Sequence, residues 1–471
     1  MNDDTLRFIR YLSFKMDCLR EQEANPLTLD VAKCESYLDQ LETMKKEKVE
    51  ALKKAMPKNT ITKKKEKPKV IYKKDGSLSS HGMKWFETLR ELKLPEDTCG
   101  PVTIIDGYED GNPNSSDQVK SWLFSLGWKP RTFKYVRNKD TGEERRIEQV
   151  RKDGHLCDSV RVLVSKDKAI ELLDGLTVIS HRIGVLKGFL SNANGNKVVA
   201  SAGGFTNTLR LQHRAPVVNL PGVEADYGEW CRGVLVSPDP DSVLCGADVS
   251  SLEDMTKRHY IKPLDPQFVD DMSHDGYDAH LDLALHAGAV IQEDIDKHNA
   301  GEINLKPLRS KYKAANYSCV YGVGAPKLAR ETGMTEREAK ALIEAYWDRN
   351  WAVKKVAKDQ YVKTLKDETM WLKNNVSGFY HNLRYDKDRW STTNQSTGVY
   401  VFDMWVMFCR RMGLEISMQY HDEILFTVKK GDEDRVSKIL LRAMAKVNEA
   451  LKLNVTIGVE EQYGDSYASV H

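Results

Sequence analysis

Residues 307–322 have the sequence Pro-Leu-Arg-Ser-Lys-Tyr-Lys-Ala-Ala-Asn-Tyr-Ser-Cys-Val-Tyr-Gly. From the third position onward, every fourth residue is cationic or aromatic, namely Arg309, Lys313, Tyr317 and Tyr321. Because four residues advance an α-helix by about 40° beyond one full turn, these side chains form one slowly turning stripe. Proline suits a first helical turn and glycine suits a helix end, so the segment predicts a helix that ends near Gly322.

The stripe is cationic in its first half and aromatic in its second half. We interpret it as a nucleotide-binding surface in which Arg309 and Lys313 hold a triphosphate. The sugar and base would lie at Tyr317 and Tyr321. The alternative is a structural helix whose first turns form salt bridges and whose aromatic end packs into a core.

A second informative segment is Val-Leu-Cys-Gly-Ala-Asp at residues 243–248. It has the pattern of a buried strand that ends in Asp248. A strand holds such a carboxylate still while its side chain points into a cleft. The alternative is a turn-forming aspartate, since aspartate is common where strands end.

A third segment lies near the C-terminus. Residues 414–418 alternate between apolar and polar side chains, and residues 424–428 form a second short apolar run. They flank the triplet His421-Asp422-Glu423, so we predict a β-hairpin with the triplet at its turn. Adjacent carboxylates repel each other unless a cation lies between them. Two strand-borne aspartates can hold two Mg²⁺ ions about 3.5–4 Å apart, although an ordinary acidic turn is the alternative.

Composition narrows the class of protein. The chain has 471 residues, of which 41% are hydrophobic and 30% charged, as expected for a multi-lobed globular enzyme. No run approaches the roughly 20 apolar residues of a membrane span, and the N-terminus is too charged for a secretory signal. The eight cysteines include no Cys-x-x-Cys pair. This pattern predicts free thiols in a reducing cytoplasm and disfavours a zinc site.

Lysines are concentrated in one stretch. Residues 45–74 hold 13 lysines against three acids. Such a run is either a solvated helix face and loop or a strip that follows a phosphate backbone.

Periodicity in the rest of the chain predicts its other helices and strands. Helical patterns cover 1–56, 167–190, 267–293 and 306–365, and short β-rich segments begin near 196. Residues 57–116 form an insertion of loops with little core of its own. Ser116 is the predicted cap of a helix that begins near Asp117.

Taken together, the three segments resemble motifs A, B and C of the family A DNA polymerases, the family of bacterial DNA polymerase I. Motif A resembles residues 248–253, motif B is matched at all five defining positions within 309–322, and motif C resembles 421–423. Within the family, the chain looks most like the replicative polymerases of short-tailed phages.

The resemblance implies an α/β (α+β) right-hand fold. The thumb would occupy 1–190, including the insertion at 57–116. The palm, built on an antiparallel sheet, would occupy 191–262 and 394–471, and the mainly helical fingers 263–393.

The resemblance also implies a function, which is DNA-directed extension of a primer 3′-hydroxyl with dNTPs by two-metal-ion nucleotidyl transfer in viral DNA replication. Asp248, Asp422 and the Val249 carbonyl would hold two Mg²⁺ ions, with Mn²⁺ as a substitute. Glu423 would tune the catalytic site.

Other positions acquire roles by the same resemblance. The dNTP-binding residues would be His280, Arg309, Lys313, Tyr317 and Glu253. Tyr317 and Glu253 would form a steric gate against a ribose 2′-hydroxyl, and a tyrosine at 317 implies ready acceptance of dideoxynucleotides. Template and primer would contact Arg210, Tyr321, Gly322, Gln395 and His421.

The chain departs from the family pattern in three places. Ser391 stands where the family has asparagine, and Met255 stands where it has a basic residue. No Asp-x-Glu exonuclease signature precedes the thumb segment. We therefore expect no proofreading by this chain and a separate 3′–5′ exonuclease polypeptide as a partner. A processivity factor at the thumb insertion is a second expected partner, and no membrane is expected.

Two other functions are alternatives to a DNA polymerase. A catalytically dead relative that serves as a DNA-binding subunit would have no use for carboxylates facing phosphates. A polymerase that reads an RNA template or makes RNA is the second alternative, and the gate formed by Glu253 and Tyr317 favours deoxynucleotides as substrates. Both residues and both aspartates favour a DNA polymerase.

Overall fold

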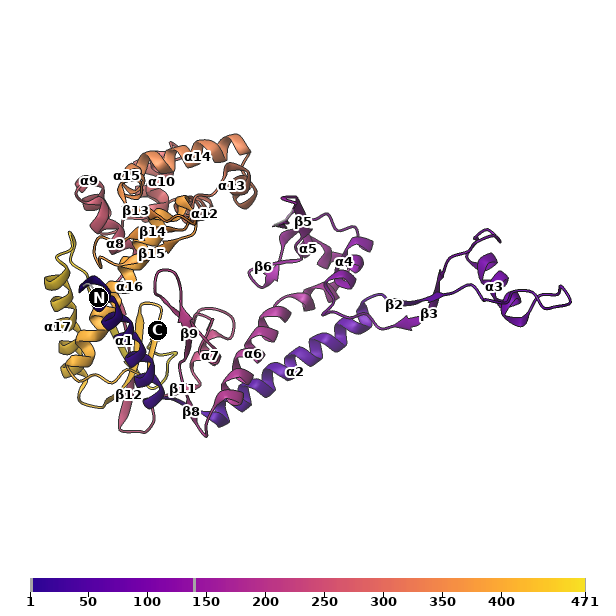
Figure 1. Cartoon of the computed structure of the whole chain (residues 1–471), viewed down its shortest axis with the longest axis horizontal. Helices are drawn as coiled ribbons and strands as arrows, with labels where there is room; N and C mark the ends of the chain where they lie inside the picture. The colour runs from indigo at the N-terminus through magenta and orange to yellow at the C-terminus, as the bar shows by residue number, and fades with distance from the viewer. Residues whose placement is uncertain (1–2, 139–140, 471) are drawn as a thin grey trace. The chain divides into compact units, whose positions relative to one another are not determined.

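The computed structural model describes residues 3–138 and 141–470 and divides into two compact units. The larger unit comprises Met1–Cys34 and Val185–His471, and the smaller unit comprises Glu35–Gly184. The smaller unit is therefore inserted into the chain of the larger one, as the colours of Figure 1 show.

The larger unit is built on a four-stranded antiparallel sheet. In spatial order its strands are β16 (Met418–Tyr420), β17 (Glu423–Lys429), β12 (Ser242–Val249) and β18 (Val459–Gly464). The small and branched apolar residues of β12 are buried, which suits its central position. Helices α16 (Arg389–Arg411) and α17 (Glu433–Leu451) share a core with the sheet, in which Trp405, Phe426 and Leu440 are fully buried.

Helices dominate residues 252–359 of the same unit. They are α8 (Leu252–Ile261), α9 (Pro266–Asp271), α10 (Ala279–His286), α11 (Gln292–Asn299), α12 (Lys306–Val320), α13 (Ala325–Thr332), α14 (Glu336–Arg349) and α15 (Trp351–Asp359). Tyr312, Leu342 and Tyr346 form part of their shared core. The helical patterns predicted from residue 267 are largely confirmed, although the last residues of the second pattern begin strand β13 (Val362–Thr364).

Short elements complete the larger unit. They are β1 (Leu27–Leu29), β8 (Lys197–Val198), β9 (Ala202–Phe205), β10 (Leu211–His213), α7 (Gly228–Arg232), β11 (Leu235–Val236), β14 (Met370–Lys373) and β15 (Tyr380–Leu383).

Helix α1 (Asp3–Ala24) is joined to α16 by a buried ion pair. Lys15 and Asp403 form this pair, and each side chain is only 3% exposed. Tyr11 donates its hydroxyl proton to the same carboxylate. The Lys15 ammonium also lies 5.6 Å from the ring centroids of Tyr11 and Phe205. This contact fixes α1 against α16.

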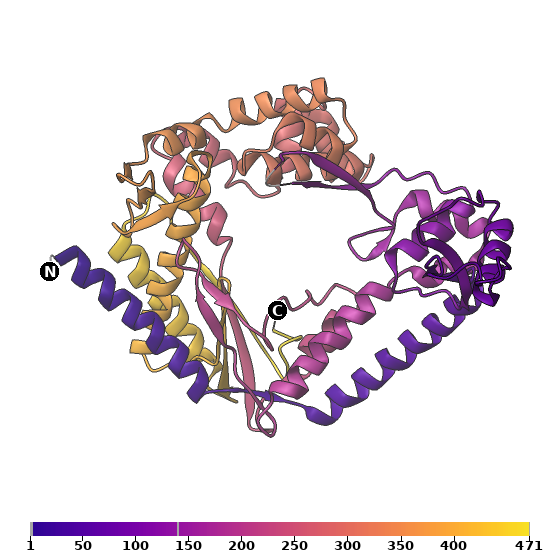
Figure 2. The same ribbon diagram turned by 45° about the vertical axis from the view of Figure 1, so that its right-hand side comes forward.

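The smaller unit is formed by two long helices and several short elements. They are α2 (Val31–Ala55), β2 (Asn59–Lys65), α3 (Ser80–Glu91), β3 (Val102–Glu109), α4 (Ser116–Ser125), β4 (Phe133–Arg137), β5 (Glu144–Glu148), β6 (Arg151–Lys152), β7 (His155–Leu156), α5 (Asp158–Arg161) and α6 (Leu176–Asn192). Helices α2 and α6 run side by side in both ribbon views (Figures 1 and 2).

Two local predictions need correction. The cap of α4 is Ser115, whose hydroxyl accepts from the Gln118 N–H, because the helix begins one residue earlier than predicted. The insertion at 57–116 is more than loops. Strands β2 and β3 pair, and α3 packs on them through a small core of Trp85, Leu89 and Val102.

The lysine-rich stretch is partly structural. Lys63 forms an ion pair with Asp106 on the paired strand. The Lys65 ammonium donates to the Thr88 hydroxyl at 2.7 Å, which ties β2 to α3. Contacts within the fold therefore account for these two lysines without a bound phosphate backbone.

Candidate active site

The two aspartates predicted to hold metal lie together at one end of the sheet. Asp248 is the last residue but one of β12 and pairs with Glu423, the first residue of β17. The Val249 N–H donates to the Asp422 carbonyl at 3.1 Å. The turn between β16 and β17 contains His421 with a φ of +60° and Asp422. Asp248 and Asp422 line one cavity of about 400 Å³. The predicted hairpin with the acidic triplet at its turn is confirmed.

Gly246 and Val470 both line this cavity, and they lie in close contact. A Cβ on Gly246 would lie 2.3 Å from the Val470 carbonyl oxygen, so only glycine admits this segment over β12. Val470 and Tyr467, both buried, therefore cover the sheet two residues from Asp248.

Glu423 belongs to a buried polar network at the cavity wall. The Tyr467 hydroxyl donates to Glu423 Oε2 at 3.1 Å, and the Arg232 guanidinium lies 4.5 Å from the centroid of the Tyr467 ring. Arg232 Nε donates to the Pro221 carbonyl at 2.7 Å, whereas its buried Nη1 has no hydrogen-bond partner among the described residues. Burial and the Glu423 carboxylate raise the pKa of Tyr467 well above its usual value, so this phenol stays protonated and donates.

Sequence reasoning did not assign roles to Arg232 or Tyr467. Neither residue has a spacing signal, because tertiary packing alone brings them to Glu423. The clue in the sequence is a lone arginine in Tyr-Gly-Glu-Trp-Cys-Arg, residues 227–232, shortly before the strand of Asp248.

The carboxylate pair suits a hard divalent ion in an open site. Its donors are oxygens, which Mg²⁺ and Mn²⁺ prefer, and Asp248 is exposed to the cavity. Within residues 3–138 and 141–470, no group of three or more His, Cys, Asp or Glu side chains forms a closed metal cage. Substrate and water oxygens would have to complete the coordination of any bound ion.

The stripe on α12 is exposed as a nucleotide-binding surface requires. Residues Tyr312, Ala315 and Cys319 bury the opposite face. Tyr317 is 58% exposed and Tyr321 is 50% exposed, so the alternative of an aromatic end packed into a core is wrong. Gly322 follows the helix with a φ of +70°, as predicted for a helix end.

Helices α10 and α12 together present the cationic part of the stripe. Arg309 donates to Asp278, the residue that caps α10, and Lys313 is exposed one turn later. His280 lies at the start of α10, where its ring centroid is 5.9 Å from that of Tyr317. Asn316 Nδ2 contacts His280 Nδ1 at 3.0 Å, and burial lowers the pKa of His280. A neutral imidazole thus stands beside two cations.

Arg210 and Glu253 lie near one another. Arg210 Nη1 is 3.9 Å from Glu253 Oε1, a long ion pair. Asn394 Nδ2 donates to the Glu253 carbonyl at 2.9 Å, which fixes the start of α8 against α16. Gln395 follows on α16 and is partly exposed.

The predicted residues therefore fall into two groups of the larger unit. One group surrounds the end of the sheet: Asp248, Val249, Glu253, Arg210, Gln395, His421, Asp422 and Glu423. The other lies on the α10–α12 pair: His280, Arg309, Lys313, Tyr317, Tyr321 and Gly322. Figure 1 shows α10 beside α12 and both apart from β12.

His213 is a further residue that the sequence did not indicate. Its ring centroid is 4.9 Å from that of Tyr420 and 5.5 Å from that of His421. Burial, with the nearby charges of His421 and Arg210, lowers the pKa of His213 to about 4.

This shift predicts a pH dependence of stability. The ordinary pKa of histidine is 6.5. Between about pH 6.5 and pH 4, His213 therefore binds a proton in the unfolded chain but stays neutral in the folded protein. Stability should therefore fall as pH drops from about 6.5 towards 4. His213→Gln is expected to flatten this part of the profile in urea unfolding experiments. His274→Gln, at an exposed histidine, is the control. An identical slope in wild type and His213→Gln would contradict the assignment.

Comparison with known proteins shows the family and the fold of the chain. The family described as DNA polymerase family A matches residues 102–469. This chain belongs to DNA polymerase family A. Family A relatives include DNA polymerase I of Lactococcus lactis subsp. lactis (strain IL1403), 26% identical over 56% of this chain and 30% of the relative. DNA polymerase I of Streptococcus pneumoniae (strain ATCC BAA-334 / TIGR4) is 23% identical over 81% of this chain and 43% of the relative. The chain thus spans less than half the length of these relatives.

A solved family A structure shows the same fold. It is described as the POL domain of Pol1 from M. smegmatis in complex with DNA primer-template and dNTP. The TM-score is 0.65 at 19% identity, and the match covers 97% of this chain and 70% of the other. The predicted fold class, helices with an antiparallel sheet in a family A polymerase arrangement, is confirmed. Across the described ranges, no helix combines the length and apolar character that a bilayer span requires.

Proposed function

We propose that this chain is a DNA-directed DNA polymerase that extends a primer 3′-hydroxyl with dNTPs. The observation that carries the proposal is the pairing of β12 with β17, which brings Asp248 and Asp422 to one cavity in a member of family A. A non-catalytic DNA-binding subunit would not require two carboxylates there, because they repel phosphates.

Asp248, Asp422 and the Val249 carbonyl would hold two divalent ions. When bound, such ions supply charge stabilisation and activate the attacking hydroxyl. The protein's own part is positioning and charge neutralisation, since phosphoryl transfer needs little covalent chemistry from side chains. Glu423 is held by Tyr467 and so shapes the cavity wall beside the pair.

Nucleotide recognition is proposed for the α10–α12 pair. Arg309 and Lys313 would neutralise the triphosphate, and Arg309 would exchange its contact with Asp278 for phosphate oxygens. The His280 ring would donate a hydrogen bond to a phosphate oxygen. Tyr317 with Glu253 would exclude a ribose 2′-hydroxyl. The exposed tyrosine at 317 would also accept dideoxynucleotides readily.

DNA contacts are proposed for five residues: Arg210, Tyr321, Gly322, Gln395 and His421. The thumb, palm and fingers would occupy the ranges expected above. We also propose a role in viral DNA replication, in which a separate 3′–5′ exonuclease and a processivity factor at 57–116 assist this chain.

A primer-extension assay tests the activity directly. Purified chain is supplied with dNTPs or rNTPs on matched DNA and RNA templates, with Mg²⁺ or Mn²⁺. Extension with dNTPs on DNA is expected. Preferential use of rNTPs, or of an RNA template, would favour the rival polymerase functions, and DNA binding without extension would favour the accessory-subunit function.

The buried network predicts a specific rate effect. Tyr467→Phe removes the hydroxyl that donates to Glu423, and loss of one hydrogen bond to a charged group corresponds to about a tenfold lower rate. We expect kcat to fall by this amount with little change in KM for dNTP. Tyr463→Phe is the matched control, because its hydroxyl donates at 3.1 Å to a backbone carbonyl of Glu433 instead. Equal kcat values for both variants would remove Tyr467 from the site.

A further inference from the structure

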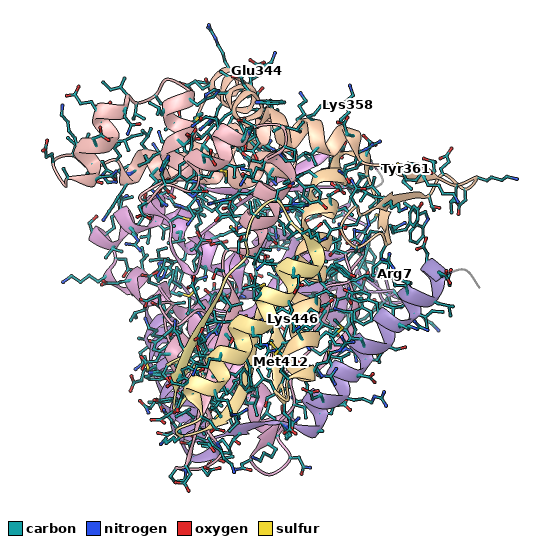
Figure 3. The ribbon with its side chains drawn as sticks, turned by 90° about the vertical axis from the view of Figure 1, so that its left-hand side faces the viewer. Arg7, Glu344, Lys358, Tyr361, Met412 and Lys446 are labelled. Atoms are coloured by element: carbon teal, nitrogen blue, oxygen red, sulfur yellow. The ribbon has the colours of Figure 1, made fainter. Side chains whose placement is uncertain are left out.

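A second cavity, larger than the one at Asp248, lies on another part of the larger unit. Its volume is about 620 Å³, within the range of small-molecule sites. It lies among α1, α16 and the segment that follows α16, and it shares no lining residue with the cavity at Asp248. Figure 3 shows this side, with Arg7 on α1 and Met412 just after α16 labelled.

The walls of this cavity are aromatic and apolar. The lining rings belong to Tyr11, Phe14, Phe379 and Tyr400, and the other apolar side chains are Met404, Met407 and Leu414. The rings of Tyr11, Phe379 and Tyr400 are mutually 5.1–5.7 Å apart at their centroids, so they form one cluster. Methionine adapts to the shape of a ligand, so such walls suit a flat or branched apolar body.

Four arginines also line the cavity, and they are of two kinds. Arg7 donates to the Ser377 carbonyl at 2.7 Å, and Arg410 pairs with Glu21, so both serve the fold. The side chains of Arg10 and Arg411 form neither an ion pair nor a hydrogen bond with any part of the chain that the structure describes.

The carboxylates of the lining do not cancel these two charges. Asp403 is paired with Lys15, and Glu21 accepts from Arg410 and from the Ile416 N–H. Glu415 is the remaining acid of the lining. The lining therefore contains two guanidinium groups and one carboxylate that have no side-chain partner among the described residues. Its net positive charge favours an anionic ligand.

We propose that this cavity is a binding site for an amphipathic organic anion, with an aromatic or branched apolar body and a carboxylate, sulfonate or phosphate group. The body occupies the aromatic and methionine walls, and the anionic group meets Arg10 and Arg411. The site is preformed, because the buried pair of Lys15 and Asp403 fixes α1 against α16. It is independent of the proposed polymerase activity.

The test uses anilinonaphthalene sulfonate, a fluorescent aromatic sulfonate, as the probe on the full chain. Saturable binding of one probe per chain is expected, and the uncharged phenylnaphthylamine should bind at least about tenfold more weakly. The double variant Arg10→Gln, Arg411→Gln should weaken probe binding by about tenfold or more, since each loses a charge-assisted contact. Arg435→Gln, at an exposed arginine paired with Asp432 outside the cavity, should not.

A steric variant separates this cavity from general hydrophobic binding. Met407→Trp fills the apolar wall and is expected to abolish the probe signal, while circular dichroism and primer extension stay as in wild type. An excess of dNTP should not displace the probe. A signal that survives both Met407→Trp and the double arginine variant, or that dNTP removes, would overturn the proposal.

Discussion

Asp422→Asn is expected to reduce primer extension by at least about a thousandfold, because it removes one of the two charges that would hold the metal ions. Asparagine has nearly the same shape as aspartate, and the turn between β16 and β17 can persist. The Val249 N–H still finds the backbone carbonyl of residue 422, since that hydrogen bond does not use the side chain. The loss should therefore appear in kcat, measured by single-nucleotide incorporation, and primer–template affinity should change little.

The matched control is Asp241→Asn. Asp241 is exposed and immediately precedes β12, at the opposite end of the strand from Asp248. The control should extend primers at the wild-type rate. Extension by Asp422→Asn within tenfold of wild type would remove Asp422 from the metal site and with it the proposed mechanism.

Asp403→Ala is expected to destabilise the larger unit by about 3–5 kcal/mol, the usual effect of leaving one buried charge without its partner. Lys15 would keep its ammonium within a site that is 3% exposed, and Tyr11 would lose its acceptor. Guanidinium unfolding followed by tryptophan fluorescence measures the change, since Trp405 lies on the same helix as Asp403.

Two companion variants make this result specific. Asp17→Ala breaks an exposed pair with Arg20 on α1 and should change the free energy of unfolding by about 0–1 kcal/mol. The double variant Lys15→Met, Asp403→Leu removes both charges and should recover most of the lost stability. If Asp403→Ala is no less stable than Asp17→Ala, the ion pair does not anchor α1.

Sequence periodicity was sufficient to predict the local structure of several parts of the candidate site. The four-residue spacing on α12 fixed which side chains share a face, and the structure exposes Tyr317 and Tyr321 on that face. Alternation around the acidic triplet predicted the turn that carries Asp422. These are local patterns, so a single sequence contains them.

Contacts between distant segments could not be predicted in this way. Arg232, Tyr467 and Glu423 meet only because β12, β17 and the segment after β18 pack together. Lys15 is likewise one lysine among many, and nothing in its neighbourhood distinguishes it until α16 supplies Asp403. The one-residue error at the cap of α4 has a local cause, because Ser115 and Ser116 are equally good caps and only backbone geometry selects the first.

The chain crosses between its two units at neighbouring points. It leaves the larger unit after Cys34 and re-enters it at Val185, and the Cys34 thiol lies 3.7 Å from the Leu186 carbonyl oxygen. A few glycines could therefore splice residue 34 to residue 185 without disturbing the sheet or α12. The smaller unit could therefore be excised, or exchanged for another domain with closely spaced ends, while every residue of the proposed active site stays in the larger unit.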